Sequence, residues 1–350
     1  MMRAAVAVVL ALATVADAAP RILNRTVATT KATCPSQFPP GKHTITLDVT
    51  DPSGAQWARS FEVFVPEEMP LAEERPAIVN WHGCGSDPEK FEEESELDQR
   101  VGRFSFYSVY PRGTSRNLEP GTQPTCNSDD PGISCGWNAG LNPGGCQTPT
   151  GPAPDDVHFA EIVVLWMRNN LCVDMDRIFI VRTHTPQLTF RTLTDLAACF
   201  QSGFSNGGQM AYRLNCELSE IFAGVATNGM NAGVWTPGLP TCTPARSIPA
   251  INYCGSSDFV NCFGPDASIL LLQTEAFAVA NGCTGIPTRS TLSSTSFCFI
   301  AEGCPGDLPV QGCGIEGLPH CWPNFPGAVR DFTPFSLSMF TRLCSILPLN

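Results

Sequence analysis

The stretch Ser202-Gly203-Phe204-Ser205-Asn206-Gly207-Gly208 contains the pattern Gly203-x-Ser205-x-Gly207. This pattern is typical of a sharp turn that joins a strand to a helix and carries a serine at its tip. The backbone is strained at such a turn, and large side chains two residues away would clash, so glycine is favoured there. Residues 209–218 have the composition of a helix, whose N-terminus would direct free N–H groups toward the serine oxygen. We therefore expect the chain to be organised around a nucleophilic Ser205.

The rest of the chain supplies alternating strands and helices. Alternating or continuous apolar runs predict strands at 42–50, 59–66, 76–81, 104–110, 177–181, 221–227, 248–254, 296–301 and 310–315. Apolar residues at helical spacing predict helices at 88–100, 155–171 (capped by Asp156), 267–280 and from Pro334 onward. This alternation, without an internal repeat or a linker, predicts a single α/β domain with a mostly parallel central sheet.

Composition restricts the compartment and the partners. The chain has 350 residues, 43% of them hydrophobic, and a net charge of −12, which argues against a nucleic acid or an anionic membrane as partner. Residues 1–18 combine Arg3, a short apolar run and an Ala16-Asp17-Ala18 cleavage pattern, so they are predicted to be a signal peptide. We expect a secreted monomer with an N-terminal segment at 19–40 and one domain at 41–350.

The cysteines support the same compartment. There are seventeen, scattered without the paired C-x-x-C spacing of zinc sites, so they predict a disulfide framework, no metal and no cofactor. Asn24 begins a glycosylation acceptor sequence. The long aperiodic segment 112–154 contains Cys126, Cys135, Cys146 and Trp137, which favour an ordered, disulfide-linked loop over disorder.

The position of the histidines limits the choice of a general base. His43, His82, His158 and His184 precede Ser205, and only His320 follows it. His320 lies in a loop just beyond the strand predicted at 310–315. Asp258 follows the strand predicted at 248–254 and is the preferred acid, because α/β sites gather at the carboxyl ends of strands. The other acids considered are Asp266, Glu275, Glu302 and Asp307.

A second glycine-rich turn, His82-Gly83-Cys84-Gly85, follows the buried strand predicted at 76–81. Such a turn can present a backbone N–H group to a developing oxyanion. An ordinary turn is the alternative.

The motifs together resemble the secreted α/β-hydrolase esterases of the poly(3-hydroxybutyrate) depolymerase-like and feruloyl esterase family. The matching pieces run in family order over about residues 40–348: His82-Gly-Cys-Gly85, Tyr110-Pro111, Gly136-Trp-Asn138, Asp155-Asp-Val157, Asp176-Arg177, Gly203-Phe-Ser-Asn-Gly-Gly208, Asp258 and His320-Cys-Trp-Pro323. The resemblance implies that Ser205 is the nucleophile, Asp258 the orienting acid and His320 the base. It also implies that the backbone N–H groups of Asn206 and Cys84 hold the oxyanion.

The substrate is left open by the sequence. Feruloyl or acetyl esters of plant polysaccharide are the leading candidates, and poly(3-hydroxybutyrate) is the alternative within the enzyme class. Trp137 and Trp322 could form an aromatic face for an aryl or polymer chain, or could pack in the core. A non-catalytic secreted binding protein on the same scaffold is the alternative from another class.

The loop that carries His320 needs support, because a base must stay within hydrogen-bond reach of its nucleophile. Residues 317–323 are rich in glycine and proline, and Cys321 follows the histidine directly. We therefore expect Cys321 to form a disulfide, with Cys254 or Cys262 as plausible partners.

Residues 181–201 depart from the family pattern, in which the strand that begins Asp-Arg runs directly into the serine turn. Removing them joins Arg177-Ile-Phe-Ile180 to Ser202 and changes seventeen cysteines to sixteen, since only Cys199 is lost. Val181 can be encoded by a codon that begins GT, and Cys199-Phe200-Gln201 by TGC-TTT-CAG. We therefore interpret 181–201 as a translated intron. The alternative is a genuine insertion, irregular and exposed over 182–196, with the strand formed by 178–181 or by 197–200.

Overall fold

The computed structural model describes residues 38–67, 74–97, 106–115, 135–140, 154–173, 199–230, 242–258 and 262–322. By its internal contacts the chain divides into two units, Met1–Thr33 and Cys34–Asn350, and every described residue belongs to the second. The predicted signal peptide, the acceptor Asn24, the strand predicted at 177–181 and the last predicted helix lie outside the described residues.

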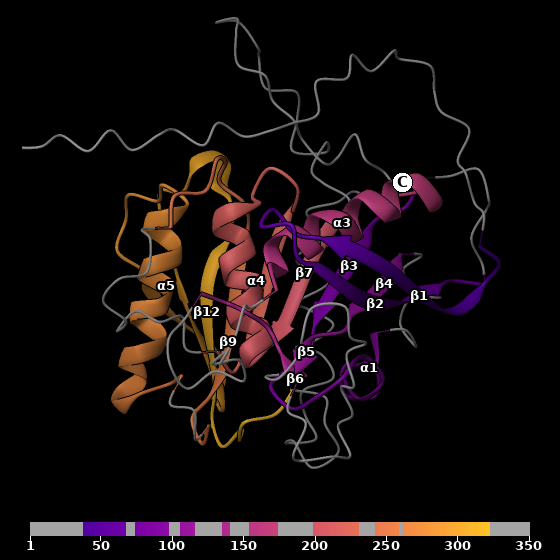
Figure 1. Cartoon of the computed structure of the whole chain (residues 1–350). Helices are drawn as coiled ribbons and strands as arrows, with labels where there is room; N and C mark the ends of the chain where they lie inside the picture. The colour runs from indigo at the N-terminus through magenta and orange to yellow at the C-terminus, as the bar shows by residue number, and fades with distance from the viewer. Residues whose placement is uncertain are drawn as a thin grey trace, which may run out of the picture. The chain divides into compact units, whose positions relative to one another are not determined.

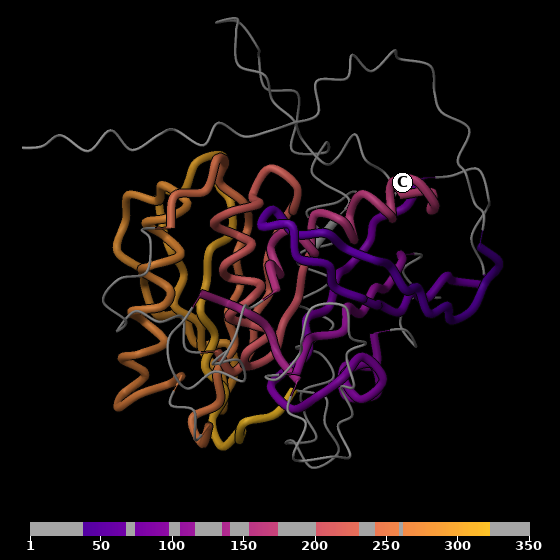
Figure 2. Tube along the Cα trace, viewed as in Figure 1, coloured from indigo at the N-terminus to yellow at the C-terminus, as the bar shows by residue number. Residues whose placement is uncertain are grey.

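One large sheet dominates the described residues (Figure 1). It contains ten strands in the order β1-β2-β4-β3-β7-β8-β9-β12-β11-β10. Their bounds are β1 Gly41–Thr50, β2 Gln56–Val65, β3 Ala77–Trp81, β4 Tyr107–Pro111, β7 Cys199–Phe204, β8 Gly224–Asn228, β9 Ala250–Gly255, β10 Thr288–Ser293, β11 Ser296–Ile300 and β12 Val310–Ile315. Figure 2 shows that the earlier part of the chain builds one side of this sheet and the later part the other.

The centre of the sheet is parallel, as predicted. The strands from β4 through β3, β7, β8 and β9 to β12 pair in parallel, and antiparallel strands flank them on both sides. Parallel neighbours place their carboxyl ends at one edge of a sheet, which is where ligands bind in α/β proteins. The residues that end these six strands at this edge are Pro111, Trp81, Phe204, Asn228, Gly255 and Ile315.

Four described helices of at least eight residues accompany the sheet. They are α1 Pro88–Ser95, α3 Asp156–Asn170, α4 Asn206–Glu217 and α5 Ser268–Ala280, and two short 3-10 turns lie at Pro265–Ala267 (η2) and Pro305–Asp307 (η3). Helix α4 packs on β3, β7 and β8, while α5 packs on β9, β11 and β12. The two helices meet where Tyr212 and Phe277 form an edge-to-face ring pair. Among the described residues, no helix is both long and apolar enough to cross a membrane.

The N-terminus of α3 corrects one sequence prediction. Asp155, and not Asp156, caps the helix by accepting from the N–H groups of Val157 and His158. Asp156 is fully buried and forms an ion pair with Arg59 of β2, at 2.7 Å.

The structure also contains elements that the sequence did not indicate. The edge strand β10 is mostly exposed and polar, so it lacks the apolar alternation by which strands are recognised. The two-residue strands β5 Thr114–Ser115 and β6 Cys135–Gly136 pair across the predicted long loop. Helix α1 ends at Ser95, earlier than predicted.

The strand that leads into Ser205 includes the last three residues of the segment 181–201. The sequence offered two places for this strand, 178–181 and 197–200, and β7 begins at Cys199, within the second. It pairs with β3 and β8 in the middle of the sheet. Gln201 lies in register between Val79 and Val225, is fully buried, and has no hydrogen-bond partner for either amide atom among the described residues. Burying an amide without partners costs about 1–3 kcal/mol. A central strand is therefore occupied by a residue that does not suit it.

We propose that residues 181–201 are a translated intron and that the active chain lacks them. Their removal would place Ile180 directly before Ser202, at the position of Gln201. A chain without 181–201 should therefore be more stable than the 350-residue chain, by at least about 2 kcal/mol in chemical unfolding.

A point variant separates the cost of burying the Gln201 amide from the other effects of deleting 181–201. Gln201→Leu in the full chain removes the unpartnered amide at nearly constant volume and should recover about 1–3 kcal/mol. A shortened chain that fails to fold, together with mature message that retains these codons, would show that the segment belongs to the protein.

Candidate active site

The turn at Ser205 has the strained geometry that the sequence predicts. Ser205 has φ 54° and ψ −119°, and it stands between the last residue of β7 and the first residue of α4. A Cβ atom on Gly203 would lie 2.2 Å from the carbonyl oxygen of Gly207. A Cβ atom on Gly207 would lie 2.0 Å from the carbonyl oxygen of Trp81 in β3. Both glycines are therefore required for α4 to turn back over the sheet.

The predicted acid and the predicted base, which follow different strands, meet beside this turn. His320, in the loop after β12, donates from Nδ1 to Oδ2 of Asp258, in the loop after β9, at 2.8 Å. The Asp258 side chain is 1% exposed and that of His320 is 10% exposed. A carboxylate held this way fixes the ring orientation of a histidine and leaves Nε2 available for proton transfer.

Phe204 connects this pair to the serine turn. It is the residue immediately before Ser205, and its ring centroid lies 4.7 Å from that of His320. Gly229, just after β8, has φ +61°, and a Cβ atom there would lie 2.9 Å from Phe204, 3.2 Å from Oδ2 of Asp258 and 3.2 Å from Cε1 of His320. The absence of a side chain at Gly229 thus allows the three groups to converge.

The loops that carry the acid and the base are bonded to each other. The N–H groups of Ser256 and Ser257 donate to the carbonyl oxygens of Ile315 and Leu318, at 2.9 and 3.1 Å. The N–H group of Gly317 donates to Oγ of Ser256 at 2.8 Å. These bonds hold the two loops as one unit across neighbouring parallel strands.

The predicted disulfide at Cys321 is wrong. Cys321 is a free thiol, and burial raises its pKa to about 11, with the charges of Asp258 and Glu94 adding to the effect. The loop is held instead by Asn228, whose Nδ2 donates to the carbonyl oxygen of Cys321 at 2.8 Å. A hydrogen bond from the neighbouring strand end therefore takes the place of the expected covalent link.

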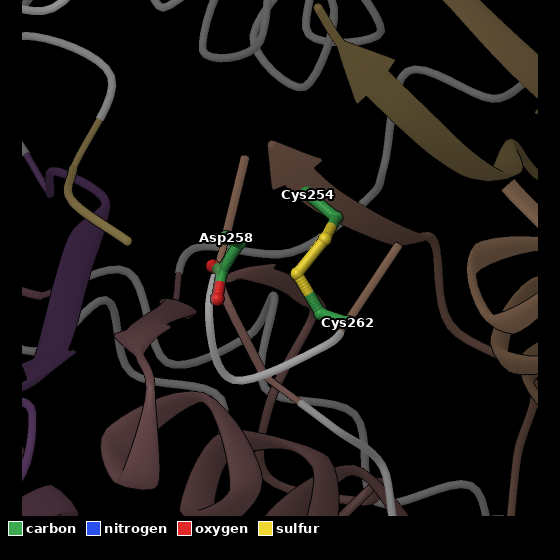
Figure 3. A group of neighbouring side chains, drawn as sticks. All are labelled: Cys254, Asp258 and Cys262. Carbon is green, nitrogen blue, oxygen red and sulfur yellow. A yellow bond between two sulfur atoms is a disulfide. The ribbon is translucent and has the colours of Figure 1, made fainter. Parts of the chain in front are cut away.

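The acid loop does contain a disulfide, between Cys254 at the end of β9 and Cys262 (Figure 3). Cys254, Asp258 and Cys262 lie close enough together to resemble a metal-ligand group. The two sulfur atoms are bonded to each other, however, so neither is a thiolate ligand. The bridge closes the short loop that presents Asp258.

Disulfides also support the rest of the domain, as predicted. The pairs Cys216–Cys242, Cys283–Cys304 and Cys298–Cys313 join residues that are 15 to 26 positions apart. Cys84, Cys135 and Cys172 are disulfide-bonded as well.

The two predicted oxyanion donors follow the ends of neighbouring strands, β7 and β3. Asn206 is the first residue of α4, where a helix leaves its N–H groups without intrahelical partners. Cys84 lies in the turn after β3, and β3 pairs with β7 so that Trp81 is in register with Gly203.

His82 fixes the turn that carries Cys84. Its ring is fully buried, Nδ1 donates to the carbonyl oxygen of Gly83 at 2.8 Å, and Nε2 accepts from the N–H group of Gly113 at 2.9 Å. These contacts require the neutral ring, and burial lowers the pKa of His82 to about 4. Its role is thus to hold the backbone.

Neither tryptophan presents a face to a substrate in this structure. Trp137 is 1% exposed and Trp322 is 3% exposed. Trp137 packs edge-to-face on Trp81, and Trp322 packs with Phe91 and Tyr110. Both rings therefore pack in the core, which was the alternative to an aromatic face for the substrate.

The sequence reading missed Phe204 and Gly229 as parts of this site. Their signals were available, since Phe204 lies inside the quoted turn and Gly229 is a glycine two residues beyond the strand predicted at 221–227. Only the tertiary structure shows that Phe204 packs on His320 and that a side chain at Gly229 would crowd it.

The pKa of His82 predicts a pH dependence of stability. Because this pKa falls from 6.5 to about 4 on folding, the unfolded chain binds the proton more readily, and stability is lost as the pH falls from about 6.5 toward 4. Glu62, whose pKa burial raises to about 7, acts in the opposite direction, so the comparison needs a variant. Between pH 7.5 and 5, the unfolding temperature of the wild type should fall more steeply than that of His82→Asn, and parallel curves would contradict this assignment.

The comparisons with known proteins agree with this architecture. No family model matches the chain. Feruloyl esterase B of Piromyces equi is 26% identical over 166 residues, which cover 44% of this chain and 31% of that protein. NocK of Nocardia uniformis subsp. tsuyamanensis, which is named as an esterase, is 26% identical over 286 residues, covering 74% of this chain and 69% of that protein. The chain thus spans about a third of the length of the first relative.

Solved structures give the fold. Acetyl xylan esterase from Aspergillus awamori matches with a TM-score of 0.55 and 13% identity, covering 87% of this chain and 99% of that chain. An S-formylglutathione hydrolase from Agrobacterium tumefaciens matches with a TM-score of 0.51 and 13% identity, covering 88% and 96%. The chain therefore has the α/β-hydrolase fold and is similar in sequence to esterases, feruloyl esterase B among them.

Proposed function

We propose that this chain is a secreted serine carboxylic-ester hydrolase that acts on feruloyl or acetyl esters of plant polysaccharide. The observation that carries the proposal is the hydrogen bond between His320 and Asp258 beside the strained turn of Ser205. A serine nucleophile needs a base, and the base needs a group that orients it. The three residue types occur in the chain order that α/β-hydrolases use.

The geometry supports a two-step mechanism. Oγ of Ser205 attacks the ester carbonyl carbon while its proton moves to Nε2 of His320, and Asp258 stabilises the resulting imidazolium. The oxyanion accepts hydrogen bonds from the N–H groups of Asn206 and Cys84. His320 then protonates the departing alcohol oxygen, which leaves an acyl group on Ser205. Water then attacks the acyl carbon while its proton moves to His320. As the bond from the acyl carbon to Oγ of Ser205 breaks, His320 returns the proton to Oγ, and the acid product leaves.

The substrate class rests on the relatives and on the compartment. A feruloyl esterase and an acetyl xylan esterase are among the matched proteins, and their names give the feruloyl and acetyl esters that we propose as substrates. The signal-peptide pattern and the disulfides favour work outside the cell.

Labelling tests the chemistry directly. The wild type in these activity tests is the chain without residues 181–201, with the residue numbers kept. A fluorophosphonate probe should react with it at Ser205, as located by mass spectrometry of the labelled peptide. Ser205→Ala should lose both labelling and ester hydrolysis, keeping only a residual of roughly 10³–10⁴ over water from binding and the oxyanion donors. Ser202→Ala is the matched control, because that hydroxyl is buried and donates to Oδ1 of Asn80, so labelling should persist.

A substrate panel tests the specificity. Methyl ferulate and acetylated xylan should be hydrolysed faster than a poly(3-hydroxybutyrate) emulsion, and the reverse order would favour the depolymerase alternative. A folded wild type that neither takes up the probe nor cleaves any of these esters would support a binding protein instead.

Gly229 gives a second prediction for the same site. Gly229→Ala introduces a methyl group against Phe204, Asp258 and His320, so it should displace the acid and base and lower kcat/KM by roughly 10–100-fold. Gly54→Ala is the control, because Gly54 also has a positive φ (+89°) but has no atom within 4 Å of the added Cβ. If both variants lose activity equally, backbone strain alone explains the effect and the crowding argument fails.

A further inference from the structure

The two proposed oxyanion donors belong to different parts of the fold, and a third segment joins them. Asn206 begins α4, while Cys84 lies in the turn after β3. An oxyanion hole works only when its donors keep a fixed separation, because the oxygen must reach both at about 3 Å. The segment around Trp137, which follows β6, contacts both sides.

Trp137 is bonded to Asn206 through the main chain. Its N–H group donates to Oδ1 of Asn206 at 2.7 Å, and Nδ2 of Asn206 donates back to the carbonyl oxygen of Trp137 at 3.3 Å. This reciprocal pair fixes the first residue of α4 in two directions. Asn206 is 5% exposed, so the pair is shielded from competing water.

The same segment is bonded to both ends of the Cys84 turn. Nε1 of Trp137 donates to the carbonyl oxygen of His82 at 2.9 Å. The N–H group of Gly85 donates to the carbonyl oxygen of Cys135 at 2.8 Å. The residues before and after Gly83 and Cys84 are therefore held by one short stretch of chain.

A buried ion pair anchors this stretch to the core. The N–H group of Asn138 donates to Oδ2 of Asp156 at 2.6 Å, and Nη2 of Arg59 donates to Oδ1 of the same carboxylate at 2.7 Å. The side chains of Arg59 and Asp156 are 1% and 0% exposed. A charge pair of this kind holds its partners firmly, because breaking it leaves an uncompensated buried charge.

We propose that Trp137 is a positioning residue that sets the separation of the two oxyanion donors. This inference rests on the proposed ester hydrolase function, and it assigns Trp137 to the support of the site and not to substrate contact. The indole N–H holds the Cys84 turn, the main chain holds Asn206, and the ion pair of Arg59 and Asp156 keeps the segment in place.

The chain provides a matched pair of variants. Trp81 packs edge-to-face on Trp137 with ring centroids 4.9 Å apart, and both rings are buried. Nε1 of Trp81 has no hydrogen-bond partner among the described residues, whereas Nε1 of Trp137 donates to His82. Trp137→Phe and Trp81→Phe therefore remove the same atoms from the same packed pair, but only the first removes a bond to the Cys84 turn.

The measurements are kcat, KM and the inhibition constant of an aryl boronic acid, which forms a tetrahedral anionic adduct with the serine. Removing an oxyanion donor outright costs about 10²–10³ in kcat, so displacing one should cost roughly 10–100-fold. Trp137→Phe should lower kcat and weaken boronic acid binding by the same factor, with KM nearly unchanged. Trp81→Phe should leave all three values close to those of the wild type.

The outcomes separate this inference from the proposed function. If both variants behave alike, Trp137 acts only in packing and the inference fails. If Trp137→Phe does not fold, Asn206→Ala tests the same point, because it keeps the backbone donor, removes the amide that pairs with Trp137, and should give the same paired loss. A wild type that is unlabelled and inactive overturns the proposed function before either variant is compared.

Discussion

The close approach of α4 to the sheet is the constraint on which the rest of the site depends. Gly207 lies so near the carbonyl oxygen of Trp81 that no side chain fits between them, and Gly203 meets the backbone of Gly207 in the same way. This contact forces Ser205 into its strained conformation at the end of β7. Packing of α4 against β3, β7 and β8 supplies the free energy that holds the strain.

The parallel sheet then determines which residues can reach the serine. The loops after β9 and β12 emerge at the same edge as β7, so Asp258 and His320 meet although 62 positions separate them in sequence. Hydrogen bonds between these two loops restrict their motion, and the bond from Asn228 to Cys321 adds a tie from β8. The site is thus supported mainly by backbone contacts of strand ends.

Buried polar groups mark where this fold is specific and where it is unsatisfied. The carbonyl oxygen of His82 and the side chains of Asn206 and Asp156 are hydrogen-bonded to the segment around Trp137, and all three residues are buried. Gln201 is also buried, yet its amide has no partner among the described residues. The first three groups are satisfied by hydrogen bonds, so their burial is compatible with the fold. The amide of Gln201 is not, and this local conflict distinguishes the segment that ends at Gln201 from the rest of the chain.

Local pattern in the sequence was sufficient to predict the serine turn, the parallel centre of the sheet, and Ser205, Asp258 and His320 as candidate residues. The predictions of the turn and of the sheet succeed because glycine sterics and apolar periodicity are encoded within a few neighbouring residues. The catalytic roles of Ser205, Asp258 and His320 stay predictions. The tertiary structure decided the free thiol of Cys321, the burial of Trp137 and Trp322, the packing of Phe204 on His320, and the lack of room for a side chain at Gly229. Each depends on segments far apart in the sequence, whose distance and orientation are fixed only when the sheet and its helices pack together.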